Sequence, residues 1–315
     1  MTADDVVLIG VDGSPASLHA LDWAAAEASQ HGWALQIVCA YALPSFAAAS
    51  LDGGYAALDD TAIQEGARAV LAEAVERVAG TGVSATASIA TGDATGVLVD
   101  LSKNARLAVV GTRGRGGFAD RLLGTVSSAL PAHSWCPTVV VPHRAADTAT
   151  DVDGSAPAPV RRIVVGVDGS PAAEAALRRA IDEAEVWGAQ LTAVAGVPVG
   201  SGAGIMAWLP AAVDHESVLK DVAEGLDVVV DRALADHPDL TVKRHVLDGT
   251  GAELLTEFST ATDLVVVGSR GRGGFRGMLL GSTSQAVLHH AACPVMVVTC
   301  RGEDDARTGR ASFSA

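Results

Sequence analysis

The sequence predicts two tandem α/β domains, each a doubly wound, five-stranded parallel sheet of the flavodoxin or Rossmann type. Three observations lead to this prediction. The 315 residues suffice for two domains of ordinary size. Short apolar runs alternate with segments of helical period, a pattern typical of parallel strands covered by helices on both faces. Two blocks of sequence also occur twice, about half the chain apart.

The composition indicates packed domains and argues against two classes of partner. Hydrophobic residues make up 49% of the chain and charged residues 19%, which suits a folded core. There are 37 acidic and 22 basic residues, so the formal net charge is −15. This field repels nucleic acids and anionic membranes. We therefore expect no nucleic-acid partner, and we expect any bound anion to need a local site with positive charge of its own.

The N-terminal residues and the cysteines favour a cytoplasmic protein. The start, Met1 to Asp5, is acidic and leads straight into a strand-like run, unlike a secretory signal. No apolar run approaches the roughly 20 residues of a membrane span. The four cysteines form no CxxC motif and no cluster with histidines that suggests a metal site. We expect free thiols, no membrane span and no metal centre.

The two repeated blocks divide the chain. VLIGVDGSP, from Val7, recurs as IVVGVDGSP from Ile163. VVGTRGRGGFADRLLGTVSSAL, from Val109, recurs as VVGSRGRGGFRGMLLGSTSQAV from Val266. Between the repeats lies a run of Ala, Asp, Thr, Ser and Pro without period, typical of a linker. We predict a first domain at 1–144, a linker at 145–160, a second domain at 161–300 and a polar tail at 301–315.

The elements of the first repeat follow from its changing period. The apolar strand Val6 to Ile9 leads into Asp-Gly-Ser-Pro, where Ser14 can cap a helix whose first residue is Pro15. Leu and Ala at helical spacing continue to Gly32, a residue that favours a helix end. Further strands are expected at 35–39, 84–89, 107–110 and 138–141, and further helices at 63–78, 96–104 and 125–133.

The ligand site of such a sheet lies at the carboxyl ends of the strands, where the strand order reverses. For the order 2-1-3-4-5, or its relative 3-2-1-4-5, this rule selects the loops after strands one and four. The loop after strand four reads GTRG, nine residues and GT from Gly111, and its twin reads GSRG, nine residues and GS from Gly268. Glycines allow positive φ and close backbone approach, and the helix start offers unpaired N–H groups to an anion. We expect Gly111 and Gly268 to use both properties.

Arginines concentrate in these loops of an otherwise acidic protein. They are Arg113, Arg115 and Arg121 in the first repeat and Arg270, Arg272 and Arg276 in the second. A lone pair of glycines is usually a turn, but here the spacing, a hydroxyl and an arginine recur together, which favours phosphate capture. The copies differ where Met278 matches Arg121 and Ala119 matches Arg276. The two sites are therefore expected to differ in affinity or phosphate preference.

The pattern G-x2-G-x9-G-[S/T], preceded by a strand ending in VDGS, resembles the ATP-binding class of the universal stress protein family. The resemblance covers Val6 to Pro142 and Ile163 to Thr299. It implies two ATP molecules per chain, with Mg²⁺ as a further candidate. It also implies a regulatory or signalling role in stress adaptation and a homodimer, and it leaves the downstream partner open.

The resemblance assigns roles to residues of both repeats. Asp12 and Asp168 contact the adenosine, although an Asp-Gly turn alone also explains them. The base approaches strand one at Gly10 and Gly166 and meets backbone groups at Ala40 and Gly196. Ribose and phosphates are held by Gly111, Thr112, Arg113, Gly114, Arg115, Gly116 and Gly117, and by Gly268, Ser269, Arg270, Gly271, Arg272, Gly273 and Gly274. The phosphate tail is held by Gly124, Thr125 and Val126, and by Gly281, Ser282, Thr283 and Ser284.

Two other classes of function compete with a nucleotide-sensing module. A slow ATPase or a nucleotidyl-transfer enzyme shares the architecture, but the chain has no SGGxDS-like, HxGH-like or GxxxxGK[S/T] motif. Flavodoxin-like electron transfer is disfavoured because the Arg-rich loop follows strand four and aromatic residues are few.

The fifth strands predict how the repeats join. Val139 to Val141 and Val295 to Val298 are apolar throughout, yet each ends its domain and would lie at a sheet edge. Soluble proteins cover or pair such edges. We expect the two fifth strands to pair, within one chain or between two.

Overall fold

The computed structural model describes residues 5–42, 60–112, 123–143, 159–198, 215–272 and 280–299. By its contacts the chain divides into two units, Met1–Cys136 with His143–Pro157, and Pro137–Pro142 with Ala158–Ala315. Both are doubly wound α/β structures with parallel strands, which confirms the predicted fold class. The domain limits read from the repeats stay a prediction, and most of the linker and all of the tail lie outside the described residues.

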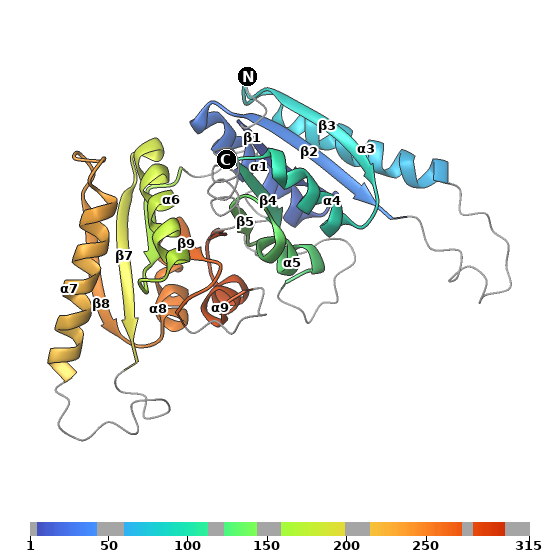
Figure 1. The fold of residues 1–315 in the computed structure, drawn as a ribbon. Coiled ribbons are helices and arrows are strands. Elements are labelled where there is room, and N and C mark those ends of the chain that lie inside the picture. The colour runs from blue at the N-terminus through green and yellow to red at the C-terminus, as the bar shows by residue number, and fades with distance from the viewer. Residues whose placement is uncertain are drawn as a thin grey trace, which may run out of the picture. The chain divides into compact units, whose positions relative to one another are not determined.

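The first unit is a parallel sheet with the strand order β3-β2-β1-β4. Its strands are β1 (Val6–Gly10), β2 (Ala34–Tyr41), β3 (Ala85–Thr91) and β4 (Leu107–Gly111). Its helices are α1 (Pro15–His31), α3 (Asp60–Val78), α4 (Ala94–Leu101) and α5 (Thr125–His133). Helices α1 and α3 pack together on one face, and α4 and α5 pack together against the same strands on the other (Figure 1). The sheet is thus buried on both sides, as its continuous apolar strands require.

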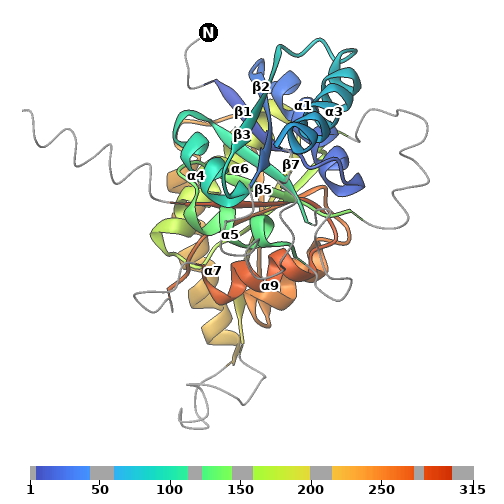
Figure 2. The same cartoon turned by 90° about the vertical axis from the view of Figure 1, so that its right-hand side faces the viewer.

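The second unit repeats this arrangement and adds a strand from the first repeat. Its sheet has the order β5-β10-β9-β6-β7-β8. The strands are β5 (Thr138–Val141), β6 (Arg162–Gly166), β7 (Gln190–Val197), β8 (Val242–Asp248), β9 (Leu264–Gly268) and β10 (Val295–Val298). The helices are α6 (Pro171–Trp187), α7 (His215–Ala233), α8 (Gly251–Phe258) and α9 (Ser282–His290). Helices α6 and α7 cover one face, and α8 and α9 lie side by side on the other (Figures 1 and 2). The five strands of the second repeat follow the order 3-2-1-4-5, the second of the two predicted alternatives.

Strand β5 pairs with β10, which confirms the predicted pairing of the fifth strands. The pairing is antiparallel, with Val140 opposite Val295 and Val139 opposite Met296. Val139 and Val140 are at most 1% exposed, so this pairing covers apolar strands that would otherwise form an edge.

The first helix of each repeat begins and ends for the predicted reasons. The hydroxyl of Ser14 accepts a hydrogen bond from the N–H of Ser17, and Pro15 is the first helical residue. Helix α1 ends at Gly32, whose φ of 67° lies in the left-handed region that glycine favours. Helix α6 repeats the cap at Ser170 and the left-handed end at Gly188.

The limits predicted for the helix at 96–104 differ from those observed. Helix α4 begins at Ala94 because the Asp93 carboxylate accepts from the N–H of Gly96 and caps the helix two residues earlier than expected. It ends at Leu101, and a 3₁₀ turn at Ser102–Asn104 completes the predicted segment. Within the described ranges, the search for a helix both long and apolar enough to cross a membrane found none.

Candidate functional site

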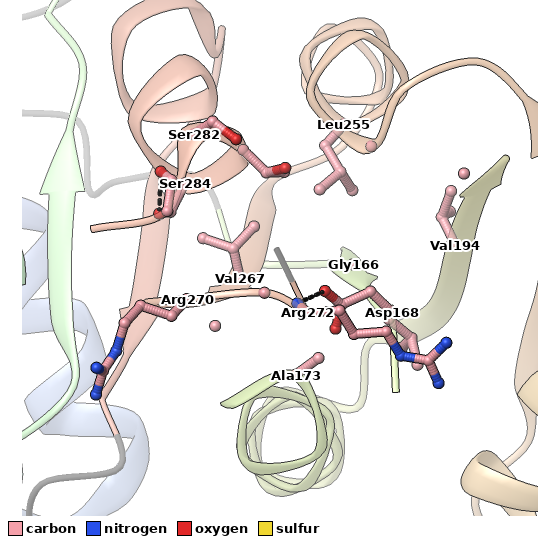
Figure 3. Close-up of a pocket in the computed structure, with 17 residues that line it drawn as sticks. Gly166, Asp168, Ala173, Val194, Leu255, Val267, Arg270, Arg272, Ser282 and Ser284 are labelled. Atoms are coloured by element: carbon pink, nitrogen blue, oxygen red, sulfur yellow. Dashed lines mark hydrogen bonds between the residues drawn. The ribbon is translucent and has the colours of Figure 1, made fainter. Parts of the chain in front are cut away.

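A cavity of about 290 Å³ lies in the second unit, where β6 has β7 on one side and β9 on the other (Figure 3). This is the point of strand reversal that the sequence rule selected. Most of the described residues predicted for the second site line the cavity. They are Gly166, Asp168, Gly196, Gly268, Arg270, Gly271, Arg272, Gly281, Ser282, Thr283 and Ser284.

Among the described residues predicted for the second site, Ser269 is the one that does not line this cavity. Gly273 and Gly274 lie outside the described residues. Ser269 is 5% exposed and is absent from the cavity wall. Its N–H donates to the carbonyl of Val298 at 2.8 Å, and its own carbonyl accepts from the N–H of Gly281 at 2.8 Å and the hydroxyl of Ser284 at 3.2 Å. Ser269 thus fixes the loop against α9 and β10 through its backbone.

Six lining residues were missed by the sequence analysis: Val167, Ala173, Val194, Gly251, Leu255 and Val267. Gly251 and Leu255 belong to α8, which begins directly beyond the carboxyl end of β8. The rule used to choose the loops after strands one and four applies to every parallel strand, so the loop after strand three was the available signal. The other four missed residues are apolar and lie near strand ends or in helix α6. In the sequence, an apolar residue predicts burial, but it does not predict a place in a cavity wall.

Asp168 organises the turn after β6. One carboxylate oxygen accepts from the N–H of Ser170 at 2.9 Å, and the other accepts from the N–H of Arg272 at 3.0 Å (Figure 3). The turn places Gly169 at a φ of 73°, and a Cβ there would collide with the guanidinium of Arg272. The turn role of this aspartate is therefore observed. Each oxygen retains a further lone pair that a ligand hydroxyl could use.

The described arginines do not gather around the start of α9. Figure 3 shows the guanidinium groups of Arg270 and Arg272 pointing away from the hydroxyl of Ser282, in two different directions. These two side chains therefore do not supply the concentration of positive charge that was expected at the start of α9. Arg113, Arg115, Arg121 and Arg276 lie outside the described residues, as do Gly114, Gly116 and Gly117.

The end of the cavity at α9 offers neutral donors instead. The helix follows Gly281, which has no side chain to cap the first turn. The N–H groups that open a helix lack partners within it, and Ser282 and Thr283 add hydroxyls at the same place. The hydroxyl of Ser284 donates to the carbonyls of Ser269 and Gly281, so it holds the loop rather than facing a ligand. This end suits an anion without any arginine.

Gly268 and Gly111 are glycines because of close packing, and the expectation of positive φ was wrong. A Cβ built on Gly268 would lie 2.6 Å from the carbonyl carbon of Ala172 in α6. A Cβ on Gly111 would lie 2.5 Å from the carbonyl oxygen of Ala16 in α1. In each repeat the first turn of the helix after strand one therefore packs directly on the glycine that ends strand four. This contact brings the turn after strand one close to the loop after strand four.

At the end of the cavity opposite α9, the ladder of backbone hydrogen bonds between β6 and β7 stops. The N–H of Val167 donates to the carbonyl of Val194 at 2.9 Å. The next bond of a parallel ladder would run from the N–H of Gly196 to the carbonyl of Val167. Among the described residues, neither of these two groups has a hydrogen-bond partner. One donor and one acceptor thus lie together at the cavity wall.

The glycine at the end of β6 has a packing role that the sequence analysis did not foresee. A Cβ on Gly166 would lie 2.7 Å from a methyl carbon of Leu255, and a Cβ on Gly10 would lie 2.7 Å from a methyl carbon of Leu98. In both repeats a leucine of the helix after strand three fills the space that was assigned to the approaching base. A ligand base would have to contact Leu255 itself.

The first repeat has the same framework around its described site residues. The carboxylate of Asp12 accepts from the N–H of Ser14 at 3.0 Å and from its hydroxyl at 2.6 Å. The carbonyl of Thr112 accepts from the N–H of Gly124 at 2.7 Å and from the hydroxyl of Ser127 at 2.8 Å. Ala40 is the last residue but one of β2, as Gly196 is of β7, and Thr125 and Val126 open α5 after Gly124. The local bonds therefore repeat the geometry seen around Ser269 and Ser284.

The fold and the cavity define a class: tandem, doubly wound α/β units with a ligand-sized opening at the carboxyl ends of parallel strands. A model of the universal stress protein family matches residues 5–142 and 159–299. A universal stress protein of Mycolicibacterium smegmatis is 36% identical over 304 residues, which cover 94% of this chain and 97% of that protein. One from Mycobacterium tuberculosis is 33% identical over 318 residues, covering 92% and 94%. The chain therefore belongs to the universal stress protein family.

A solved structure shares the fold over nearly the whole chain. The crystal structure of a universal stress protein from Archaeoglobus fulgidus has a TM-score of 0.67 and 22% sequence identity. The similarity covers 95% of this chain and 99% of that chain. At this identity it supports the architecture of the two repeats and says nothing about a ligand.

Proposed function

We propose that the protein binds adenine nucleotides, one in each repeat, and that binding serves a regulatory or signalling role in stress adaptation. The observation that carries this proposal is the interrupted ladder at the end of β6. The N–H of Gly196 and the carbonyl of Val167, which have no hydrogen-bond partner in the described part of the chain, form a donor and acceptor pair at the cavity wall. The edge of adenine carries an amino donor next to a ring-nitrogen acceptor, which complements this pair.

The rest of the cavity accommodates the remainder of a nucleotide. Asp168 lies next along the chain, with carboxylate lone pairs available for a sugar hydroxyl. Beyond it the start of α9 offers N–H groups and hydroxyls to phosphates. The cavity volume of about 290 Å³ lies just below the range for small-molecule sites, roughly 300–1,000 Å³. This volume suits a nucleoside whose phosphates extend along α9 toward solvent.

The repeated framework extends the proposal to the first repeat, which gives a stoichiometry of two per chain. We further propose that Mg²⁺ accompanies the phosphates, that the protein forms homodimers, and that it works in the cytoplasm. Cys39, Cys136 and Cys293 are buried and form no disulfide among the described residues, which is compatible with a reducing compartment.

Native mass spectrometry of the full chain at millimolar ATP tests the stoichiometry. We expect a species with two nucleotides bound, and the mass of nucleotide released from purified protein should identify the base. A chain that stays free of nucleotide under these conditions would refute the proposal. A turnover assay with limiting ATP separates a binding module from a slow ATPase, because only the enzyme releases product beyond the bound equivalents.

A further inference from the structure

One position near the proposed sites is occupied by different residues in the two repeats: Ser17 in α1 and Ala173 in α6. Their surroundings show that the two positions are equivalent. The N–H of each donates to the hydroxyl of the helix-capping serine at 3.2 Å. Each backbone also lies against the glycine that ends strand four, with the nitrogens of Ser17 and Ala173 at 3.1 and 2.9 Å from a Cβ built there. Both residues are 4% exposed, so they differ only by a buried hydroxyl.

In the first repeat this hydroxyl is fully used within the turn. The oxygen of Ser17 accepts from the N–H of Asp12 at 3.3 Å and donates to the carbonyl of Ser14 at 2.9 Å. The backbone donor of Asp12 is thereby satisfied by the protein itself. A ligand that approaches this turn finds an N–H that already has a partner.

In the second repeat the corresponding donor is the N–H of Asp168. Ala173 has no hydroxyl, and the N–H of Asp168 has no acceptor among the described residues. Both Asp168 and Ala173 line the cavity, and Figure 3 shows the Ala173 side chain directed from α6 toward it. Asp168 is exposed, so in the free protein water can satisfy this N–H, and an acceptor oxygen of a bound ligand can take the place of that water.

The direction of this N–H follows from the strand that precedes it. The N–H of Val167 faces β7, where it donates to Val194. Successive N–H groups of an extended chain point to opposite sides, so the N–H of Asp168 faces the β9 side. That side leads from the base toward the sugar and the phosphates in the proposed mode of binding.

We propose that Ala173 gives the second nucleotide site a hydrogen bond that the first lacks, because it leaves the N–H of Asp168 to donate to an oxygen of the sugar. This inference rests on the proposed function. In the first site Ser17 occupies the donor, and the nucleotide gains no bond there. One neutral hydrogen bond corresponds to an affinity difference of roughly two- to tenfold.

Calorimetric titration of the full chain with ATP tests this inference through reciprocal variants. We expect two dissociation constants in the wild-type chain. Ala173→Ser should weaken binding to the second repeat by roughly two- to tenfold, and Ser17→Ala should strengthen binding to the first repeat by a similar factor. The double variant should show both changes, one in each repeat. Each change adds or removes one oxygen, and thermal unfolding without ATP monitors the fold.

Ser102→Ala is the matched control. Ser102 is 1% exposed and has the same pair of bonds, accepting from the N–H of Trp135 and donating to the carbonyl of Val99, but it precedes β4 and so lies at the amino ends of the strands, not at the carboxyl ends where the proposed sites are. Its loss should leave both dissociation constants unchanged. If the chain binds two ATP molecules and neither reciprocal variant shifts its own step, this inference is wrong while the proposed function stands. If no variant and no wild-type chain binds ATP, the proposed function itself is refuted.

Discussion

The two repeats share the serine cap after strand one and the bonds of the loop after strand four, and they differ at Ser17 and Ala173 and at the helix that follows strand three. Helix α8 begins with a reciprocal capping box, in which the hydroxyl of Thr250 accepts from the N–H of Glu253 and the carboxylate of Glu253 accepts from the N–H of Thr250. Helix α4 begins with Asp93 alone, because its third residue is Gly96. The framework at the ends of strands one and four is thus kept, and the capping difference changes how firmly the helix start after strand three is held.

The largest expected effect comes from the glycine that brings strand four against the first helix. Gly268→Val should abolish binding in the second repeat and Gly111→Val binding in the first, because a side chain at either position must displace the backbone of the neighbouring helix. Forcing such volume into a packed site typically destabilises a protein by about 1–3 kcal/mol or more. Native mass spectrometry should show one bound nucleotide per chain for each single variant.

Gly66→Ala and Gly225→Ala serve as controls for these glycine variants. Both positions lie in helices, α3 and α7, and a Cβ at either would meet nothing within 4 Å. Both controls should keep two nucleotides. Retention of two nucleotides by Gly268→Val would show that the site has been placed wrongly.

The pairing of β5 with β10 gives the next largest effect. Val140→Asp should destabilise the second unit by several kcal/mol, since it buries an unpaired carboxylate at a residue that is 1% exposed. Hydrogen exchange at residues 139–141 should be slow in the full chain, approaching the rate set by global unfolding. The same amides should exchange fast in an isolated first repeat, residues 1–144. Equal protection in the two proteins would mean that β5 is covered without β10.

Arg121 has no arginine counterpart in the second repeat, so we expect it to contribute to nucleotide affinity in the first repeat only. Arg121→Ala should weaken nucleotide binding to the first repeat by roughly ten- to a hundredfold, the loss typical of one charged hydrogen bond. Met278, its counterpart, can be changed to Ala as a control that leaves affinity unchanged. Calorimetry would contradict this prediction if Arg121→Ala kept both dissociation constants of the wild-type chain.

The smallest expected effect concerns the two helix starts after strand three. Asp93→Ala and Thr250→Ala should each cost about 1 kcal/mol of stability through the lost cap. Hydrogen bonds from the hydroxyl and the N–H of Thr250 hold the pKa of Glu253 below its ordinary value of 4.5. A carboxyl whose folded pKa is lowered stabilises the protein above its unfolded pKa, and that contribution disappears as the pH falls through the folded pKa.

Urea unfolding at neutral pH and below pH 4.5 checks this point. Glu253→Gln should remove the part of the acid sensitivity that comes from this carboxyl. A Glu253→Gln protein with the same loss of stability on acidification as the wild type would show that the capping box does not contribute to it.

Much of the fold could be predicted because its signals are local. The strand runs, the caps at Ser14 and Ser170, and the helix ends at Gly32 and Gly188 depend on residues within a few positions of one another. The start of α4 at Ala94 was missed because several residues near it could cap a helix, and only the observed bond from Gly96 to Asp93 selects one.

The sequence by itself determined the duplication, the alternation of strands and helices, and the loops at which a ligand site could form. These follow from periodicity and from a repeated pattern of glycines, which need no knowledge of distant contacts. Tertiary structure decided why Gly268 must be glycine, which arginines face away from α9, and that Leu255 and Ala173 line the cavity. It also decided which backbone donors are left free, because a hydrogen bond such as that from Asp12 to Ser17 depends on how a strand end and a helix start pack together.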